Sequence, residues 1–446
     1  MTVEPSTTPQ TLSATTPASQ AGALLDRFLS IRGRSIAVAE PLDPEDCVVQ
    51  SMTETSPIKW HLAHTTWFFE AFVLQPHRKN YRPFDADFNY LFNSYYNTIG
   101  DRQPRPSRGM LTRPTMKQVL DYRKHVDRAV ARLCDREELH KILEIGLQHE
   151  QQHQELMLTD VKHLLSLNPI QPPYRTRPTH VSAEPSHPLR ASDNGNRGAG
   201  GVEELNYITV PHSIFWLGHR GVGFAFDNEG PRHKVYLDAF EIGDRLITNA
   251  EYLAFMADGG YERPELWLDE GWQHVQSQGW RAPLYWRESD GSWEVYTLDG
   301  TVALAPDEPV CHISFFEADA YARWAGARLP TEAEWEAASV TAPIEGHFAE
   351  ADHLHPQPVA STTPSYPRQM FGDVWQWTAS AYLPYRGFRP PAGALGEYNG
   401  KFMCNQFVLR GGSCVTPRSH IRRTYRNFFP PESRWQFSGI RLALDQ

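Results

Sequence analysis

A break rich in proline and glycine divides this chain into two parts with different hydrophobic patterns. It extends from about Ser166 to Glu204 and contains the segments PIQPPYRTRP, EPSHP and SDNGNRGAGG. Proline lacks a backbone N–H and glycine is conformationally free, so a helix or central strand does not continue through such a stretch. A chain of 446 residues is also too long for one hydrophobic core. The predicted segments are two domains at 21–170 and 205–446, a linker at 171–204 and a disordered, Thr- and Pro-rich tail at 1–20.

The first part has the periodicity of amphipathic helices. Trp60, His64, Trp67 and Ala71 recur at spacings of four, three and four, so they share one helix face. A longer stripe with the same spacing passes through the two histidines of HEQQH and reaches Asp160. Four helices are expected, at about residues 24–36, 57–74, 115–133 and 137–165. These predict a four-helix bundle, and the long connection at about 77–114 is expected to be functional.

The second part is rich in Gly and Trp and alternates over short stretches such as HKVYLDAFEI and FVLRGG. Helical periodicity is limited to TNAEYLAFMADGG and SFFEADAYARWAGA. We therefore expect short strands and loops around two helices. The whole chain is predicted to be an α+β protein, with a helical bundle first and a domain of little regular secondary structure second.

The charge and cysteine content indicate which partners and which cellular compartment the protein is expected to have. The formal net charge is −10, which argues against nucleic acid and anionic membranes as partners. The five cysteines are widely spaced without a CxxC motif, which favours a reducing compartment and no disulfide framework. No signal-peptide pattern opens the chain, and no apolar run is long enough to cross a bilayer. We expect a cytoplasmic protein.

Three histidines of the first part form a candidate metal site. His149 and His153 stand four residues apart on one predicted helix, so both imidazoles can reach one ion. His64 lies in the apolar stripe of another helix, and three imidazoles pointing into a bundle would leave open coordination positions. Four other histidines are expected at the surface: His61, His125, His140 and His163.

The same letters allow a second interpretation. His149 to His153 match H-E-x-x-H, in which Glu150 would be the general base of a zinc-dependent hydrolase. The extended form of that motif requires Gly at 156 and His at 159, where this chain has Leu156 and Thr159. A zinc hydrolase or thiol transferase therefore remains the alternative from another functional class.

Several segments resemble a known pair of domains. WHLAH, NSYYNTIG, RPSRGMLTRPT and HEQQHQELMLTDVKHLL resemble the DinB-like domain of the sulfoxide synthases of ergothioneine biosynthesis. The second part resembles the fold of formylglycine-generating enzymes, which is similar to that of C-type lectins. Its matching segments include FDNEGPRHKVYLDAF, RLPTEAEWEAA, FGDVWQWTASAY and VLRGGSCVTPRSHIRRTYRNFFPP. The pairing of both domains in this order is what makes the resemblance specific.

The resemblance implies an oxidoreductase that contains iron and uses O2. His64, His149 and His153 match the Fe(II) ligands of the family. The expected reaction joins the sulfur of a thiol to C2 of hercynine, N-alpha-trimethylhistidine, and places one oxygen on sulfur. Gln152 and Asn427 match residues that hold hercynine, and Phe428 takes an aromatic position near its trimethylammonium group.

The thiol substrate is expected to bind through its carboxylate. Family members use arginines of the long N-terminal connection, and Arg105 and Arg108 are the best candidates, followed by Arg102. Members that take gamma-glutamylcysteine have an Asp two positions after the Asn, where this chain has Phe429. The resemblance therefore implies free cysteine as the donor, with gamma-glutamylcysteine as the alternative.

A tyrosine is expected to supply a proton during the reaction, as in the family. Tyr95 and Tyr96 of NSYYN are the first candidates, and Tyr398 and Tyr385 follow.

The second domain is not expected to be a formylglycine-generating enzyme itself. Those enzymes bind copper through two nearby cysteines. Cys414 follows RGGS, but Ser419 stands where the second thiol would be needed. The domain is therefore predicted to bind substrate, because a shared fold does not carry an activity with it.

Overall fold

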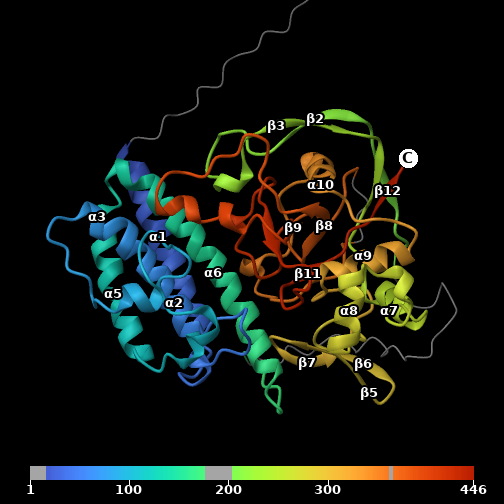
Figure 1. Cartoon of the computed structure of the whole chain (residues 1–446), viewed down its shortest axis with the longest axis horizontal. Coiled ribbons are helices and arrows are strands. Elements are labelled where there is room, and N and C mark those ends of the chain that lie inside the picture. The colour runs from blue at the N-terminus through green and yellow to red at the C-terminus, as the bar shows by residue number, and fades with distance from the viewer. Residues whose placement is uncertain (1–16, 176–202, 361–364) are drawn as a thin grey trace, which may run out of the picture.

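The computed structural model of the protein describes residues 17–175, 203–360 and 365–446. A helical domain lies on one side of the molecule and a mixed domain on the other, with the long helix α6 (His140–Ser166) between them (Figure 1). No helix of the described residues has the length and apolar character needed to cross a membrane.

The N-terminal domain is the four-helix bundle that the periodicity predicts. Helix α2 (Ile58–Phe69) packs against both α5 (Met116–Val130) and α6, and α1 (Pro17–Ala39) packs against α6. Thr115 caps α5, because its side chain accepts from Gln118 N while the Gln118 side chain accepts from Thr115 N. A π-helical turn, Glu70–Leu74, continues α2 into the short α3 (Gln75–His77), and α4 (Phe88–Phe92) lies within the long connection.

The predicted helix and segment boundaries differ from the structure in two places. Helix α1 begins at Pro17, inside the predicted tail, and the rest of that tail lies outside the described residues. The start of the predicted linker is packed, because Tyr174 N donates to Leu298 O at 2.8 Å and its hydroxyl donates to Val38 O at 2.7 Å. Residues 176–202 of the linker also lie outside the described residues.

The C-terminal domain consists of small sheets joined by loops. Its central sheet has the order β10-β9-β8-β11, in which β11 pairs parallel with β8 and the other pairs are antiparallel. The second sheet has the order β1-β4-β12, and the other two are β2-β3 and β5-β6-β7. The strands are β1 (Tyr207–Val210), β2 (Ser213–Leu217), β3 (His233–Leu237), β4 (Phe240–Gly243), β5 (Trp286–Ser289), β6 (Ser292–Thr297), β7 (Gly300–Ala303), β8 (Trp375–Ala381), β9 (Phe407–Arg410), β10 (Asn427–Phe429), β11 (Ser438–Gly439) and β12 (Ala443–Asp445).

This domain contains more helix than its periodicity predicts. The two expected helices are α7 (Asn249–Ala257) and α9 (Phe315–Trp324), whose N-termini carry capping boxes. Two further helices, α8 (Asp269–Gln278) and α10 (Glu332–Ala338), are too short to show a clear stripe. The TEAE segment that begins α10 is nevertheless a capping box, since the Thr331 side chain accepts from Glu334 N.

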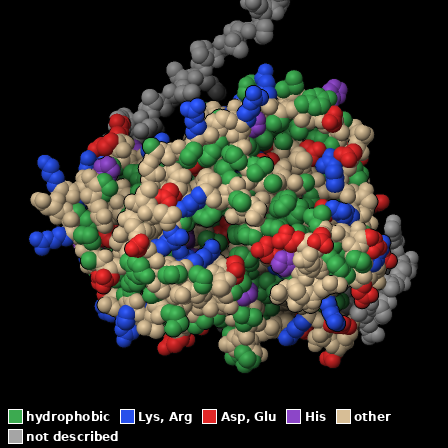
Figure 2. Space-filling model, viewed as in Figure 1, with side chains coloured by type: hydrophobic (Ala, Val, Ile, Leu, Met, Phe, Trp, Pro, Cys, Tyr) green, Lys and Arg blue, Asp and Glu red, His purple; other side chains and the backbone are tan. Residues whose placement is uncertain are grey.

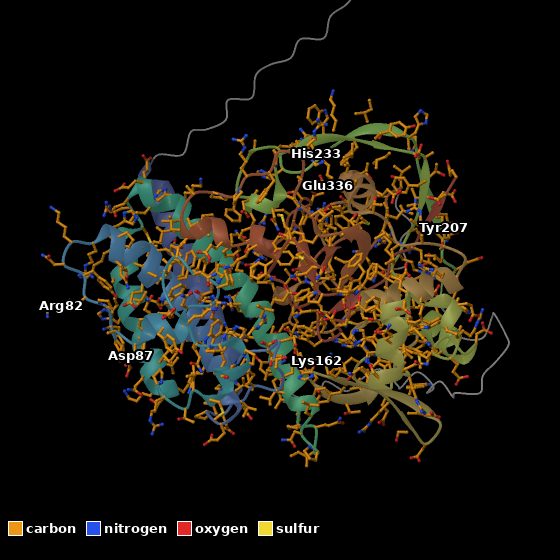
Figure 3. The ribbon with its side chains drawn as sticks, viewed as in Figure 1. Arg82, Asp87, Lys162, Tyr207, His233 and Glu336 are labelled. Atoms are coloured by element: carbon orange, nitrogen blue, oxygen red, sulfur yellow. The ribbon has the colours of Figure 1, made fainter. Side chains whose placement is uncertain are left out.

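Helix α6 is shared by the two domains. One face belongs to the bundle, and the opposite polar face is buried against the second domain instead of facing water. On that face lies Lys162, which is labelled in Figure 3. Its Nζ is 2.7 Å from Nε2 of His312. Glu155 accepts from three donors of the second domain: Trp375 Nε1 at 2.7 Å, Ser413 Oγ at 2.7 Å and Thr416 Oγ1 at 2.8 Å.

Candidate metal centre

The three histidines of the predicted site converge between α2 and α6. One potential ligand atom from each of His64, His149 and His153 lies within 4.8 Å of the others. Nε2 of His64 is 3.2 Å from Nε2 of His149. His64 and His149 are buried and His153 is partly buried, so the site lies in the interior of the molecule.

The chemistry of the donors fits a metal cation. Nδ1 of His64 donates to Phe92 O at 2.6 Å, which leaves the Nε2 lone pair free to bind an ion. Burial lowers the pKa of all three imidazoles, that of His149 to about 3, so they are neutral as ligands must be. Nδ1 of His149 finds no hydrogen-bond partner among the described residues. Nitrogen lone pairs that face one another in the interior are satisfied by a cation.

Two tryptophans fix the plane of His64. Trp60 stacks on its imidazole with ring centroids 4.5 Å apart, and Trp67 lies near parallel on it at 5.6 Å. The spacing places Trp60, His64 and Trp67 on one face of α2, which explains why a tryptophan stands on each side of His64 in WHLAHTTW. Such packing restricts rotation of the imidazole and prepares it for a ligand role.

Glu150 points away from the three histidines. Its carboxylate oxygens accept from Arg32 at 2.6 Å and from Arg123 at 2.8 Å, on the bundle side of α6. Ser35 Oγ donates to the same carboxylate at 2.6 Å. A glutamate held in this way is a structural ion-pair partner and cannot be the general base of an H-E-x-x-H peptidase.

His61 is not at the surface, which corrects the prediction for that residue. It is buried beside His153, with 2.7 Å between the two Nδ1 atoms, and its Nε2 is 3.0 Å from Oδ2 of Asp160. The sequence held a signal for this, since His61 is one turn before His64 and Asp160 lies in the same stripe as His153.

The second domain contributes a tyrosine to the site. The hydroxyl of Tyr398 donates to Oε1 of Gln152, and Nε2 of Gln152 donates to the hydroxyl of Tyr425 at 2.7 Å. The Tyr398 ring lies 5.7 Å from that of His149 and stacks on Phe226 at 5.3 Å. Gln152, one residue before His153, is therefore held from both sides by the second domain.

A chain of hydrogen bonds connects Gln148 to Tyr398 through His420, Tyr425 and Gln152. Charged residues beside Gln148 set the direction of these bonds. Gln148 Nε2 donates to Glu144 at 2.9 Å and its Oε1 accepts from Arg422 at 3.3 Å, so the amide orientation is fixed. Nδ1 of His420 lies 2.7 Å from that Oε1 and must donate to it, which leaves its Nε2 to accept from Tyr425 at 3.0 Å. The chain therefore ends with the Tyr398 proton directed at Gln152.

Arg108 is a buried cation without an acidic partner. Its guanidinium donates to Ser56 Oγ at 2.9 Å and Ser94 Oγ at 3.0 Å and lies 3.4 Å from the centroid of the Trp60 ring. Within the described ranges its hydrogen-bond partners are these two hydroxyls and no carboxylate. Burial lowers its pKa well below the usual value, and the charge of Arg105 adds to this. Arg105 donates to Glu54 O, and Arg102 donates to Asn97 Oδ1.

Lys and Arg side chains lie beside a hollow between the two halves of the molecule, and Asp and Glu side chains lie on its other side, towards the mixed domain (Figure 2). The basic side chains can attract a carboxylate. Arg108 lies behind the surface, where it stacks on the tryptophan that fixes His64.

The candidate tyrosines lie at different depths. Tyr95 is 6.2 Å from the ring of Tyr398, and Tyr96 is buried 5.6 Å from that of Trp67. Both therefore contact groups that touch the histidines. Tyr385 instead belongs to a separate ion-pair network of the second domain, where its hydroxyl donates to Glu332 at 3.2 Å.

Two of the residues expected to hold hercynine, Asn427 and Phe428, lie on β10, whereas Gln152 lies on α6. Phe428 stacks on Tyr382 with ring centroids 4.0 Å apart, and Phe402 bridges it to Tyr95 at 6.0 Å and 5.1 Å. Asn427 Oδ1 accepts from the backbone N of Phe428 at 3.0 Å. Phe429, next on the strand, lies 5.9 Å from the ring of Trp435.

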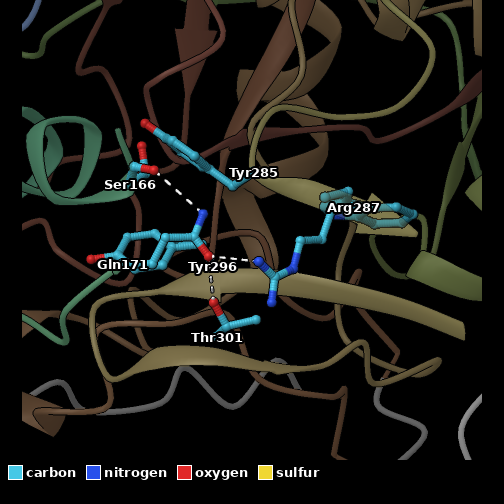
Figure 4. A pocket seen from close by; sticks show the side chains of 7 residues that line it. Ser166, Gln171, Tyr285, Arg287, Tyr296 and Thr301 are labelled. Carbon is cyan, nitrogen blue, oxygen red and sulfur yellow. Dashed lines mark hydrogen bonds between the residues drawn. The ribbon is translucent and has the colours of Figure 1, made fainter. Parts of the chain in front are cut away.

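Two of the cavities among the described residues lie outside the histidine cluster. A small one of about 120 Å³ contains Gln171, which binds Ser166, Arg287 and Thr301 and so fills its polar positions internally (Figure 4). A cleft of about 600 Å³ lies beyond Gln148 and is lined by aromatic side chains and arginines. Its Arg27 and Arg422 are already paired, with Glu144 and Glu229.

Both halves match known domain families. Residues 202–446 match the sulfatase-modifying factor enzyme 1-like domain, and residues 27–157 match the DinB superfamily. Cys414 is buried and Ser419 accepts from Gln151 at 2.6 Å, which fits the absence of a thiol pair at these two positions. Fold and site together define a two-domain protein whose histidine cluster lies in a DinB-type bundle and is covered by a domain of the formylglycine-generating-enzyme type.

The relatives narrow this class further. The hercynine oxygenase of Mycolicibacterium smegmatis is 36% identical over 330 residues, which cover 67% of this chain and 70% of that protein. The hercynine oxygenase of Mycobacterium tuberculosis is 40% identical over 50% of this chain and 56% of its own length. The formylglycine-generating enzyme of Streptomyces coelicolor is 30% identical over 53% of this chain and 88% of its own. The chain belongs to the hercynine oxygenase family.

Proposed function

We propose that this protein is a non-haem Fe(II) enzyme that uses O2 to join the sulfur of cysteine to C2 of hercynine and gives hercynylcysteine sulfoxide. The observation that carries this proposal is the cluster of three neutral imidazoles, beside which Tyr398 of the second domain donates to Gln152 of α6. The cluster leaves open coordination positions for two substrates and O2.

The proposed metal ligands are His64, His149 and His153. Bound there, Fe(II) would supply the O2-activating, one-electron chemistry that side chains lack. The zinc-hydrolase alternative is not favoured, because Glu150 is fully paired with Arg32 and Arg123 and has no access to a metal-bound water.

Hercynine is proposed to bind between α6 and the second domain. Gln152 offers an amide already oriented by Tyr398 and Tyr425. Phe428 offers an aromatic face, which attracts a quaternary ammonium without a proton. The carboxylate of hercynine is assigned to Asn427, whose side chain bonds only to its own strand within the described residues.

Arg108 is proposed to bind the carboxylate of the thiol substrate, with Arg105 beside it. A buried guanidinium whose donors reach only two hydroxyls has an unmet preference for an anion. We expect Arg108→Ala to raise the KM for the thiol about 10- to 100-fold, as loss of one charge-assisted contact implies, and to leave the KM for hercynine within about threefold. Steady-state O2 uptake with each substrate varied in turn measures this.

The matched control is Arg113→Ala, on the same connection but exposed. It should leave both KM values unchanged, and Arg108→Lys should recover only part of the loss because lysine cannot form the bidentate contact. Equal KM values for the thiol in wild type and Arg108→Ala would show that Arg108 does not bind the thiol substrate.

Free cysteine is proposed as the donor. The apolar Phe429 lies 5.9 Å from Trp435, where an acidic side chain would be needed to receive a glutamyl ammonium group. Burying that ammonium beside two aromatic rings without a carboxylate would cost more than binding the smaller thiol.

The proton is proposed to come from Tyr95 or Tyr96, with Tyr398 as the third candidate because its ring contacts His149. Phenylalanine at the donor position should lower kcat about 10²- to 10⁴-fold, the usual contribution of a positioned acid. The other two replacements should cost less than about tenfold. Single-turnover product analysis measures this, with metal content as a check.

Tyr90→Phe, on the same connection and half-exposed, is the control and should be neutral. Full activity of all three site variants would show that no tyrosine of this group supplies the proton.

The proposed function is tested by loading the protein with iron under anaerobic conditions and adding O2 with hercynine and a thiol. Cysteine and gamma-glutamylcysteine are compared in parallel. Sulfoxide formation from cysteine with consumption of O2 is the expected result. Consumption of O2 with gamma-glutamylcysteine but not with cysteine would overturn the assignment of the donor. No O2 uptake with either thiol would overturn the proposed function.

A further inference from the structure

A chain of three hydrogen-bonded groups reaches the histidine cluster from behind. It consists of Asp160, His61 and His153, all contributed by α2 and α6. We propose that His61 and Asp160 are positioning residues that fix the tautomer and the orientation of the His153 imidazole, so that its Nε2 is presented to the metal. This inference rests on the proposed metal site and deepens it.

The acceptor end of the chain is Asp160. An ionised carboxylate can only accept, and Oδ2 lies 2.8 Å from the backbone N of Ser56 and 3.0 Å from Nε2 of His61. The negative charge of Asp160 also raises the pKa of Arg105 and Arg108, in opposition to burial. The proton of a neutral His61 is therefore on Nε2.

The direction of the next bond follows from this tautomer. With its proton on Nε2, His61 has a lone pair at Nδ1, and the atom 2.7 Å away is Nδ1 of His153. His153 must donate there, so its proton is on Nδ1 and its lone pair is on Nε2. The same tautomer is fixed in His64 by the carbonyl of Phe92.

This chain of hydrogen bonds is rigid because all three of its side chains are on the helices α2 and α6. His61 stands one turn before His64 on α2, and Asp160 stands seven residues after His153 on one face of α6. The side chains of His61 and Asp160 are only 3% and 6% exposed, so water does not compete for these bonds. Their ring and carboxylate positions are thus set by the same two helices that position the ligands.

A histidine ligand is tuned by what its second nitrogen contacts. A carboxylate acting through a hydrogen-bonded group raises ligand basicity and holds the ring in place, and loss of such a partner typically costs about 10- to 100-fold in metal affinity. His149, whose Nδ1 has no partner within the described ranges, lacks this support, so His153 is expected to contribute more to metal retention.

The first test uses the metal-free protein with ¹⁵N-labelled histidine. Nitrogen chemical shifts and one-bond couplings should show His61 protonated at Nε2 and His153 protonated at Nδ1. The opposite tautomer at His153 would overturn the proposal, and this readout needs neither activity nor a variant that folds.

The second test measures Fe(II) affinity by anaerobic titration without substrates. His61→Leu should weaken binding about 10- to 100-fold. His61→Asn should stay within about threefold of wild type, because its side-chain oxygen replaces the Nδ1 acceptor. His163→Leu is the control and should bind like wild type, because His163 lies on α6 but contacts Ser51 at 2.7 Å.

Unchanged affinity in His61→Leu, or equal losses in the Leu and Asn variants, would reduce His61 to a packing role and overturn the inference. These failures are distinct from that of the proposed function. If the wild-type protein itself retained no metal, the function would fail, while the tautomers of the metal-free protein would still decide the inference.

Discussion

Replacing His64 by alanine is expected to abolish stable iron binding and, with it, O2 uptake. The imidazole is held between Trp60 and Trp67 and has its Nε2 lone pair directed at His149, so no neighbouring side chain can take its place. Loss of a supporting residue alone costs about 10- to 100-fold in affinity, and loss of a ligand should exceed that range. Metal content after anaerobic loading and gel filtration is the measurement.

The control for this experiment is His125→Ala, an exposed histidine on α5 of the same bundle. It should retain metal and turnover. Stoichiometric iron in His64→Ala would mean that the cluster is not the metal site, whatever the activity of the variant.

A second large effect is expected at Glu150, in this case on stability. Glu150→Gln removes the negative charge that pairs with the buried Arg123 and leaves Arg32 paired with the partly exposed Asp127, and breaking a buried ion pair typically costs about 3–5 kcal/mol. The free energy of unfolding in urea should fall by that amount. Glu144→Gln, on the same helix but paired with the exposed Arg27, should cost about 1 kcal/mol or less.

The same carboxylate makes stability depend on pH. Burial acts to raise the pKa of Glu150, but the charges of Arg32 and Arg123 outweigh it and lower the pKa from 4.5 to about 2. A carboxylate with a depressed pKa stabilises the fold above its unfolded value, and that contribution is lost as pH falls from 4.5 towards 2. The shift corresponds to about 3 kcal/mol. The gap between wild type and Glu150→Gln should therefore narrow steadily below pH 4.5.

Stability measurements on Glu150→Gln also separate the two functional classes. A hydrolase that used Glu150 as a base would lose activity in this variant with its stability unchanged. The ion pairs of Glu150 predict the opposite result, in which the free energy of unfolding falls and the activity of the folded protein is affected less. A variant as stable as wild type would contradict the structural role assigned to Glu150.

Local patterns were sufficient to predict the cluster of three histidines. The spacing of Trp60, His64 and Trp67, and of His149 and His153, specified which side chains share a face, and the structure brings the three histidines together. The resemblance supplied the pairing of the domains, which the comparisons confirm. The capping box of α10 was present in the sequence, but a short helix has no stripe to support it.

The features of the site that could not be predicted from the sequence depend on contacts between distant segments. Gln152 is held by Tyr398 and Tyr425, which are 246 and 273 residues away, and no periodicity connects them. The burial of His61 was missed although it stands one turn before His64, because spacing within α2 does not show that His153 and Asp160 of α6 face it. That contact depends on the position of α6 relative to α2.

A helix that belongs to two cores has a consequence for how this protein can change over generations. The middle turns of α6 present no water-facing side on which substitutions would be neutral, since Glu155 and Lys162 serve one domain and Glu150 serves the other. Exchange of the second domain for a different one would strand these groups without partners and remove Tyr398 from Gln152. The two domains are therefore expected to evolve together, and a substitution in one domain where it contacts α6 requires a compensating substitution in the other.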